Sequence, residues 1–417
     1  MENLFTCIDQ CRCCGSTNLI DILDLGKQPL ANSLKDAADK EDQKFPLSTV
    51  QCTDCSLYQN KETIKKEVLF DHYVWVTGTS AGAKDYCESF YERVVHVGEL
   101  KKDDLVVEIA SNDGTFLQPF VKGGYRVLGV EPALNIAKMA QEASVPTLAA
   151  YWGTKTARKI NTEAGKPKIV IARNVMPHVS MLHDVVDGIH ASLGDDGVGV
   201  IEFHDAGAIQ RELHYDSIYH EHLSYFTLKT MAHLLNAHGL FIFDLDTSPI
   251  SGGSYVIYFT KERRSKSAKY TDAIAREKDS RVNETDTWLD FAKRVHEHRA
   301  KTKELLEAFS GRTIIGFGAS ARSSTYLNFC GLTNKDIQCI IDNNPLKQGR
   351  YTAGSSIPIV TMEQGLALKP ELLFVLAWNF KDEIIHSCQD KEYRGEYLIP
   401  FPSAPYLQST INEGSLV

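Results

Sequence analysis

Short apolar runs alternate with helix-length amphipathic stretches over most of the chain. From residue 105 the sequence reads as an apolar strand (LVVEI), a turn with one glycine, a helix, a Gly-rich turn and a second strand (LGVEP). The strands KIVIARN and VGVIEFH follow, with a helical stretch between them. Strands and helices that alternate in this order predict a doubly wound parallel sheet, which binds ligands at the carboxyl ends of its strands.

A second series with the same alternation starts at residue 313 with TIIGFGASARSSTYLNFCG and continues through the strands QCIIDNNP, ELLFVLAWNF and EYLIPFP. The charged residues 263–306 between the two series predict one or two long solvated helices. Paired apolar runs at 240–262 are expected to close the first sheet, and a helix that ends at Gly98 is expected to precede it. The chain is therefore expected to contain two parallel α/β units.

Four cysteines near the N-terminus form two CxxC pairs. Cys11 and Cys14 make the first pair, and Cys52 and Cys55 make the second. Two such knuckles can close a tetrahedral thiolate shell around zinc, and four protein ligands leave no open position for chemistry, so we expect a structural zinc site. The stretch LDLGKQPLANSL between the pairs favours short strands and turns. Two further thiols could confuse the ligand count: Cys7 and Cys13.

The first turn of the parallel series distinguishes between cofactors. The turn EIASNDG, from Glu108 to Gly114, has one glycine and lacks the GxGxxG pattern that cradles a pyrophosphate, so NAD is disfavoured. Glu131 ends the second strand 17 residues beyond Gly114, close to the separation expected of a carboxylate that holds ribose hydroxyls. A looser turn with an acidic strand end is typical of S-adenosylmethionine (SAM) sites, where an amino-acid tail replaces the phosphates.

Polar side chains follow two other strand ends of this unit. Asn174 and His178 come just past one end, and His204 and Asp205 come past another. Because the carboxyl ends of parallel strands meet at one edge of the sheet, we expect these groups around one crevice.

The segment SIYHEHLSYF at 217–226 follows and holds Tyr219, His220, Glu221 and His222 in consecutive positions. An extended segment would separate Tyr219 from His222, whereas a helical turn would bring the two together. Either geometry leaves a possible base beside an orienting group, and an imidazole titrates near neutral pH, so the segment suits proton abstraction. A polar surface loop is the alternative. A metal site is disfavoured because the spacing is not HExxH.

The second α/β unit also has a glycine turn, GFGA at 316–319. The helix that follows carries Arg322 near its start, where the helix amides and the guanidinium could receive a phosphate. The next strand ends in Asp342, with Lys347 and Arg350 just beyond it. One GxGA turn is compatible with a nucleotide site and with a purely structural turn, and the sequence leaves both interpretations open.

Composition and charge narrow the partners. The 417 residues carry a net charge of −9 and no long Lys/Arg run, which argues against nucleic acid or an anionic membrane as the main partner. The start MENLFTCIDQ lacks the basic lead and apolar core of a signal peptide, and no apolar run approaches the ~18 residues of a membrane span. A cytoplasmic location is therefore expected.

Taken in order, these segments resemble the SAM-dependent C-methyltransferases that act on nucleotide-linked keto-deoxysugars. The resemblance covers nearly the full chain and rests on the CxxC pairs, EIASNDG, VEP at Glu131, NVMPHV, YHEH, GFGAS, DNNPLKQGR and LAWN. It implies an α/β protein with a small zinc-binding domain at 1–70, a Rossmann-like SAM methyltransferase domain at 71–260 and a Rossmann-like sugar-nucleotide-binding domain at 261–417. The nucleotide sugar would lie in the cleft between the last two domains.

The resemblance also implies roles for single residues. His222 would be the base, Tyr219, Glu221 and His178 would lie at the sugar, and Tyr73 would reach it from the N-terminal region. The residues implied to hold SAM are Glu108, Ala110, Asn112, Gly114, Glu131, Pro132 and Asn174. The residues implied to hold the sugar nucleotide are Gly318, Arg322, Asn328, Asp342, Lys347, Arg350, Trp378 and Asn379.

Two departures from the family pattern involve three positions. Ala110 stands where the SAM turn usually has glycine, and Ser251 and Val256 stand where a His and an Arg are expected. The second departure lies on the side of the sugar nucleotide and bears on the identity of the substrate.

The expected chemistry follows from these residue types. A base removes the proton from a carbon beside a ketone, Tyr219 or His178 donates to the enolate oxygen, and the carbon attacks the methyl group of SAM without a catalytic metal. We expect a monomer that methylates C-3 of a 4-keto-6-deoxyhexose. The alternatives are an O- or N-methyltransferase of another small metabolite and a non-catalytic zinc and nucleotide-binding protein.

Overall fold

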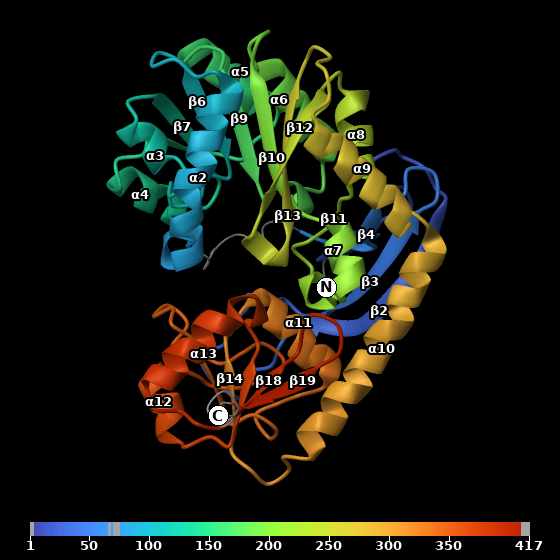
Figure 1. The fold of residues 1–417 in the computed structure, drawn as a ribbon, viewed down its shortest axis with the longest axis vertical. Coiled ribbons are helices and arrows are strands. Elements are labelled where there is room, and N and C mark those ends of the chain that lie inside the picture. Colours follow the sequence, from blue (N-terminus) through green and yellow to red (C-terminus); the bar gives the residue numbers. More distant parts are fainter. Residues whose placement is uncertain (1–3, 66–67, 70–75, 410–417) are drawn as a thin grey trace, which may run out of the picture.

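A computed structural model of the chain describes residues 4–65, 68–69 and 76–409 (Figure 1). Two α/β units lie at opposite ends of the molecule, and a smaller N-terminal sheet lies between them beside a long helix (Figure 1). The fold class expected from the sequence is confirmed. Tyr73, which was expected to reach the sugar, lies outside the described residues.

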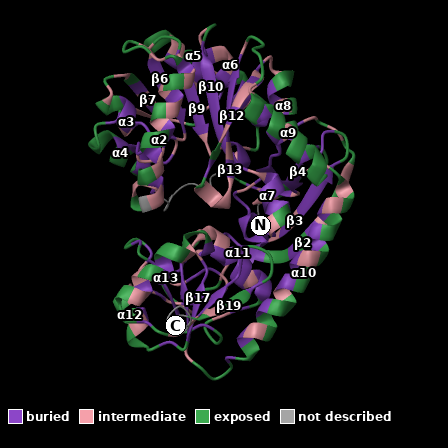
Figure 2. Cartoon of the chain, viewed as in Figure 1, coloured by how far each residue is buried: buried purple, intermediate pink, exposed green. Residues whose placement is uncertain are grey.

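The first α/β unit, expected from the resemblance to be the methyltransferase and called the methyltransferase unit below, contains a seven-stranded sheet in the order β12-β13-β10-β9-β6-β7-β8. Its five parallel strands are β6 (Leu105–Ile109), β7 (Arg126–Glu131), β8 (Thr147–Ala149), β9 (Ile169–Arg173) and β10 (Val198–His204). The antiparallel strands β12 (Phe241–Ser248) and β13 (Ser254–Thr260) close one edge, as predicted. Every residue of β6 and of β10 is buried, as expected of central strands covered on both faces (Figure 2).

Helices cover both faces of this sheet. They are α2 (Ala81–Gly98), α3 (Gln118–Lys122), α4 (Leu134–Glu142), α5 (Thr154–Glu163), α6 (Leu182–Ser192) and α8 (Leu228–Ala237). Helix α7 (Ala206–Glu212) lies beyond the end of β10 and contacts the 3-10 turn η3 (Tyr215–Ser217) (Figure 1). Helix α2 ends at Gly98, as predicted. In the described segments, none of the helices combines the length and the apolar character that a membrane crossing requires.

The C-terminal unit is a six-stranded sheet in the order β16-β15-β14-β17-β18-β19. Its strands are β14 (Ile314–Phe317), β15 (Cys339–Ile341), β16 (Ile359–Val360), β17 (Leu372–Val375), β18 (Glu396–Ile399) and β19 (Tyr406–Ser409). All neighbouring pairs are parallel except β18 and β19. The helices of this unit are α11 (Ala321–Cys330), α12 (Met362–Ala367) and α13 (Lys381–Asp390).

Two helices connect the α/β units: α9 (Ala268–Ser280) and α10 (Thr285–Glu307). The prediction of one or two helices is confirmed, but α10 is not solvated all round. Trp288, Phe291 and Val295 recur at helical spacing and are buried (Figure 2). The Trp288 ring stacks on Tyr58 of the N-terminal sheet, with 3.8 Å between ring centroids. An apolar stripe inside a charged helix therefore attaches α10 to the N-terminal sheet.

The N-terminal unit contains the pair β1 (Phe5–Cys7) and β5 (Glu62–Ile64) and the sheet formed by β2 (Leu19–Pro29), β3 (Lys44–Cys52) and β4 (Tyr58–Asn60). The sequence predicted short strands between the cysteine pairs. The structure has one 11-residue strand there, β2, and its pairing with β3 shifts register twice. Gly26 lies at the second shift with a φ of 74°, so the punctuation in the sequence marks bulges rather than strand ends.

A strand from the methyltransferase unit completes the N-terminal sheet. Strand β11 (Ser224–Tyr225) pairs antiparallel with β4, and the sheet order is β11-β4-β3-β2. Because β11 directly follows the YHEH segment, the candidate catalytic residues lie where the two units join.

Candidate active site

The four CxxC cysteines form one compact cluster. The sulfur atoms of Cys11, Cys14, Cys52 and Cys55 all lie within 4.8 Å of one another, with 3.5 Å between Cys11 and Cys55 and 3.6 Å between Cys14 and Cys52. Thiolates in a tetrahedron about 2.3 Å from zinc are roughly 3.8 Å apart, so the four sulfurs fit a closed zinc site. The residues are those predicted.

The two additional thiols are not part of that cluster. Cys7 is exposed in β1. Cys13 is buried in the first knuckle, where its backbone N–H donates to the Cys11 sulfur at 3.4 Å.

The first strand-to-helix turn of the methyltransferase unit has an unusual backbone. Ala110, Asn112 and Gly114 all have positive φ, at 49°, 50° and 79°. A Cβ on Gly114 would lie 2.8 Å from a methyl group of Val145, so glycine is needed there for space as well as for conformation. Ala110 adopts the left-handed conformation despite its methyl group, at a cost of about 1 kcal/mol.

Glu131 holds this turn from the neighbouring strand. Its Oε2 accepts from the Asn112 N–H at 2.9 Å and its Oε1 accepts from the Ala133 N–H at 2.9 Å. Pro132 lies between Glu131 and Ala133 in the sequence. Each carboxylate oxygen has a second lone pair, so Glu131 can still accept from a ribose hydroxyl. Its burial raises the pKa of its carboxyl group, although both N–H donors oppose the shift.

A second buried carboxylate lies beneath the same turn. Burial raises the pKa of Glu108 to about 8, and within the described residues its Oε2 has no hydrogen-bond partner. The charge of Arg173 opposes that shift, but its guanidinium bonds at 2.8 Å to Glu202. An unpaired acidic group at this position fits the ammonium group of the amino-acid tail of SAM, because a cationic donor would satisfy it. Asn174, at the end of β9, has a φ of 53° and donates its N–H to the Glu202 carbonyl at 2.7 Å.

The YHEH segment forms a turn, so the helical-turn geometry is the one adopted. The His222 N–H donates to the Tyr219 carbonyl at 2.9 Å, and the two rings lie 4.0 Å apart. The His222 Nδ1 lies 2.8 Å from the Ser217 carbonyl, so Nδ1 carries the proton. The His222 Nε2 therefore accepts from the Tyr219 hydroxyl, at 2.7 Å. The phenol and the imidazole form a proton-transfer pair.

His178 lies against this pair. It belongs to a 3-10 turn, η2 (Met176–His178), and its ring meets that of His222 edge to face at 4.7 Å. Burial lowers the pKa of His178 to about 4, while a hydrogen bond to the Glu221 main chain opposes the shift. Burial and the neighbouring His178 also hold the pKa of His222 well below its usual range. Both imidazoles are therefore neutral near pH 7, so each has one ring nitrogen without a proton, and neither has the near-neutral pKa expected from the sequence.

Glu221 and His220 face the N-terminal sheet. The Asn32 amide donates to the Glu221 carboxylate at 2.7 Å, and burial raises the pKa of Glu221 to about 7. The His220 ring donates from Nε2 to the Pro46 carbonyl at 3.1 Å. The bonds that orient His222 come from Tyr219 and Ser217.

Other polar residues at the strand ends have different partners. His204 lies at the end of β10, with its Nε2 3.4 Å from the Nδ1 of His214. The carboxylate of Asp205 caps α7 by accepting from the Gly207 and Ala208 N–H groups. Asp205 therefore caps a helix.

The GFGA turn of the C-terminal unit is filled by the chain itself. Asp342 accepts from the Ala319 N–H at 2.9 Å and from the Asn344 N–H at 2.9 Å. The buried Lys347 ammonium donates to the Asp342 carboxylate at 3.2 Å and to the Ala319 carbonyl at 2.9 Å. Gly318 has a φ of 98°, and a Cβ there would collide with Ala377. Its glycine is thus required by packing within the unit.

Arg322 contacts the methyltransferase unit. Its guanidinium forms a two-pronged pair with the buried Asp216 at 2.9 and 3.0 Å and donates to the Ser251 carbonyl at 3.0 Å. The Trp378 indole donates to the same carboxylate at 2.8 Å. Ser251 thus contacts Arg322 through its main chain, and its own φ is 62°. Val256, at the other departure from the family pattern, is buried in β13 opposite Glu202.

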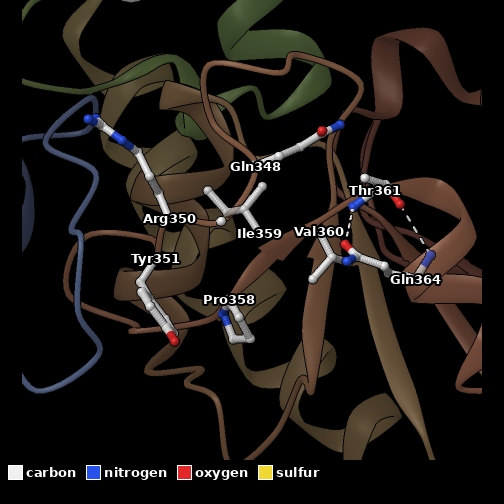
Figure 3. Close-up of a pocket in the computed structure, with 9 residues that line it drawn as sticks. Gln348, Arg350, Tyr351, Pro358, Ile359, Val360, Thr361 and Gln364 are labelled. Atoms are coloured by element: carbon white, nitrogen blue, oxygen red, sulfur yellow. Dashed lines mark hydrogen bonds between the residues drawn. The ribbon is translucent and has the colours of Figure 1, made fainter.

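The remaining residues expected to bind the sugar nucleotide are spread over this unit. Asn328 donates to the Ser324 and Ala353 carbonyls and supports the fold, whereas Asn379 is exposed beside Trp378. Arg350 lines an open groove of about 390 Å³ at the edge strand β16, opposite Thr361 and Gln364 (Figure 3). Its guanidinium lies 3.6 Å from the exposed carboxylate of Asp36.

Sequence reasoning missed two residues that the site depends on, Asn60 and Asp216. Asn60 bonds to the main chain of Tyr219, and Asp216 joins the two α/β units. Neither lies in a motif. The sequence pattern does not reveal their roles because the partner of each is more than 100 residues away.

Comparison with known proteins agrees with this arrangement. Family profiles match a zinc binding domain at 11–70, a methyltransferase domain at 82–244 and a C-methyltransferase C-terminal domain at 249–402. The C-methyltransferase NovU of Streptomyces niveus is 32% identical over 413 residues, covering 96% of this chain and 97% of that protein.

Among solved structures, two similar chains each cover 47% of this one. The PH0226 protein from Pyrococcus horikoshii OT3 is 15% identical, with a TM-score of 0.37, over 47% of this chain and 98% of that one. Magnesium protoporphyrin IX methyltransferase from Synechocystis PCC 6803 is 12% identical, with a TM-score of 0.34, over 47% of this chain and 89% of that one. The full-length match to NovU and the three domain profiles show that the chain belongs to the SAM-dependent C-methyltransferases with an N-terminal zinc-binding domain.

Proposed function

We propose that this C-methyltransferase acts on a nucleotide-linked keto-deoxysugar and methylates the carbon beside the ketone, C-3 of a 4-keto-6-deoxyhexose. The observation that carries the proposal is the bonded pair of Tyr219 and His222, a neutral acceptor behind a phenol, at 2.7 Å. Methylation at such a carbon requires removal of a proton, which the methyl donor cannot do. The relative NovU, a C-methyltransferase by name, covers both this segment and the C-terminal unit.

The base must work through this pair. Both ring nitrogens of His222 are engaged, Nδ1 with the Ser217 carbonyl and Nε2 with the Tyr219 hydroxyl. Either Tyr219 takes the substrate proton as its own phenol proton moves to His222, or the Tyr219 hydroxyl swings away and His222 acts directly. In both cases His222 ends as an imidazolium whose Nδ1–H stays on the Ser217 carbonyl. His222 remains the proposed final proton acceptor.

His178 is better suited to accept than to donate. Its bond to the Glu221 main chain takes one ring N–H, and Nδ1 has no partner among the described residues. In that tautomer Nδ1 offers a lone pair, which fits a sugar hydroxyl and not an enolate oxygen. The proposed donor to the enolate oxygen is therefore Tyr219.

SAM, when bound, supplies the methyl group. Glu131 is proposed to hold its ribose hydroxyls, and Glu108 the ammonium group of its amino-acid tail, with Asn112 and Gly114 shaping the turn. The C-terminal unit is proposed to hold the nucleotide. The exposed Asn379 can do so as it stands, and Arg350 is held only by an exposed contact of 3.6 Å with Asp36, whereas Arg322 and Lys347 would first have to leave their buried carboxylate partners.

A panel of nucleotide-linked 4-keto-6-deoxyhexoses tests the proposal. Each is incubated with the protein and SAM carrying a ¹³C-labelled methyl group, and the product is analysed by mass and by carbon–carbon coupling. We expect one labelled methyl group bonded to a ring carbon next to the ketone. A methyl group on oxygen or nitrogen, or no product from any sugar while SAM binds normally, would contradict the proposal.

A further inference from the structure

The YHEH segment is held in place largely by the N-terminal sheet. Strand β11 pairs with β4, with Ser224 opposite Gln59 and Tyr225 opposite Tyr58. His220 bonds to the Pro46 carbonyl and Glu221 to the Asn32 amide. Both partners belong to the N-terminal unit, which contains the cysteine cluster and is called the zinc-binding unit below. The catalytic segment is therefore as much a part of that unit as of the methyltransferase unit.

Asn60, the last residue of β4, forms several hydrogen bonds to the YHEH segment and to β11. Its side-chain amide donates to the Tyr219 carbonyl at 2.9 Å, and its side-chain oxygen accepts from the Tyr225 hydroxyl at 3.1 Å. Its backbone N–H donates to the Leu223 carbonyl at 3.0 Å. Three polar groups of one fully buried residue thus bond to the segment that contains His222.

The fourth polar group of Asn60 points to the zinc site. Its carbonyl accepts from the Arg12 guanidinium at 2.6 Å, and Arg12 lies inside the first CxxC knuckle, between Cys11 and Cys14. The neighbouring Gln59 donates to the Cys11 sulfur at 3.2 Å and accepts from the Arg12 guanidinium at 3.2 Å. Two residues therefore span the distance from a zinc ligand to Tyr219.

We propose that Asn60 is a positioning residue that transmits the geometry of the zinc knuckle to the Tyr219–His222 pair, so that the zinc-binding unit sets the rate of proton abstraction. The inference rests on the proposed function. It goes beyond a zinc site that only stabilises folding, because it predicts a loss of turnover in a chain that is folded and has zinc bound. A reacting group misplaced by about 1 Å can cost roughly 100-fold in rate.

Two variants of Asn60 test the proposal, with one matched control. Asn60→Ala removes both side-chain bonds, and Asn60→Asp keeps the shape but faces the Tyr219 carbonyl with an acceptor. The control is Thr49→Val, because Thr49 is fully buried, lies opposite Asn60 in the same sheet and bonds to Tyr58 and Leu23, not to the catalytic segment.

We expect both Asn60 variants to keep about one zinc per chain and their affinity for SAM. Their kcat should fall about tenfold or more, with KM for the sugar nucleotide within roughly threefold of wild type, as expected when a transition-state interaction is lost. Thr49→Val should keep the wild-type kcat. Wild-type kcat in both Asn60 variants, or an equal loss of kcat in Thr49→Val, would overturn the proposal.

A measurement without substrate separates this inference from the proposed function. In protein labelled with ¹⁵N-histidine, the His222 signals are identified by their absence in His222→Asn. We expect the Nε2 signal of His222 to move in Asn60→Ala, because the Tyr219 bond is disturbed. The surface pair of His183 and His238, 2.7 Å apart, should stay unchanged as an internal reference. An unmoved His222 signal would overturn the inference even if no keto-sugar is turned over.

Discussion

The two parallel sheets end their second strands in the same way and then diverge. In the methyltransferase unit, Glu131 accepts from a backbone N–H of the first turn and from the N–H two residues beyond itself. In the C-terminal unit, Asp342 does the same with Ala319 and Asn344. An acidic residue at this position therefore stabilises the turn in both units, whether or not a ligand binds there.

The difference lies in what occupies the space beside each carboxylate. In the C-terminal unit, Lys347 fills it and neutralises Asp342. In the methyltransferase unit no cation of the described chain pairs with Glu131 or with Glu108, and an oxygen of Glu108 is left without a partner. A buried acidic group that the chain does not satisfy is a better sign of a cofactor site than the acidic strand end that both units share.

The largest expected effect is on folding, in the C-terminal turn. Asp342→Ala leaves the buried Lys347 ammonium without its counter-charge, which should lower the free energy of unfolding by about 3 to 5 kcal/mol. SAM affinity, measured by calorimetry below the unfolding temperature, should not change. Combining Asp342→Ala with Lys347→Met should recover part of the stability. If Asp342→Ala weakened SAM binding instead, the assignment of the two turns would be reversed.

Glu131→Ala should show the opposite pattern. Loss of a charged acceptor for the ribose is expected to weaken SAM binding by about 1 to 3 kcal/mol, seen as a roughly 5- to 150-fold higher dissociation constant. Its effect on unfolding should be smaller than that of Asp342→Ala, because no buried cation is left unpaired. An unchanged dissociation constant would remove the main functional distinction between the two turns.

The free energy of unfolding should fall at low pH in part because of His220, a buried residue of the YHEH segment. Burial lowers the pKa of His220 to about 4, from a usual value of 6.5. Between pH 6.5 and 4 the unfolded chain binds a proton on this residue and the folded chain does not, so stability falls as pH falls. His220→Asn should make that decline shallower by up to about 1.4 kcal/mol per pH unit. Urea unfolding of both proteins at several pH values measures the slope, and equal slopes would show that His220 titrates normally.

Local patterns predicted the parts of the fold whose cause is local. The CxxC spacing identified all four sulfurs of the cluster, and the alternating apolar runs gave both parallel sheets. The end of α2 at Gly98 followed in the same way.

Long-range pairing could not be found in this way. The bond of Asn60 to Tyr219 joins residues 159 positions apart, and the pair of Arg322 with Asp216 joins residues 106 apart. Arg322 follows a glycine turn at a helix start, a pattern that equally suits a phosphate, and only the packing of the two units brings Asp216 to it. Composition and spacing carry no information about which of two anions a buried arginine meets.

The exchange of the substrate proton with solvent tests the central claim most directly. The protein is incubated in D₂O with the accepted keto-sugar nucleotide and without SAM, and deuterium uptake at the carbon beside the ketone is followed by mass. Wild type should exchange that proton. His222→Asn, with the sugar nucleotide still bound, should exchange it about 100-fold more slowly, the usual contribution of a positioned general base. Exchange at the wild-type rate in His222→Asn would contradict the assignment of His222 as the proton acceptor.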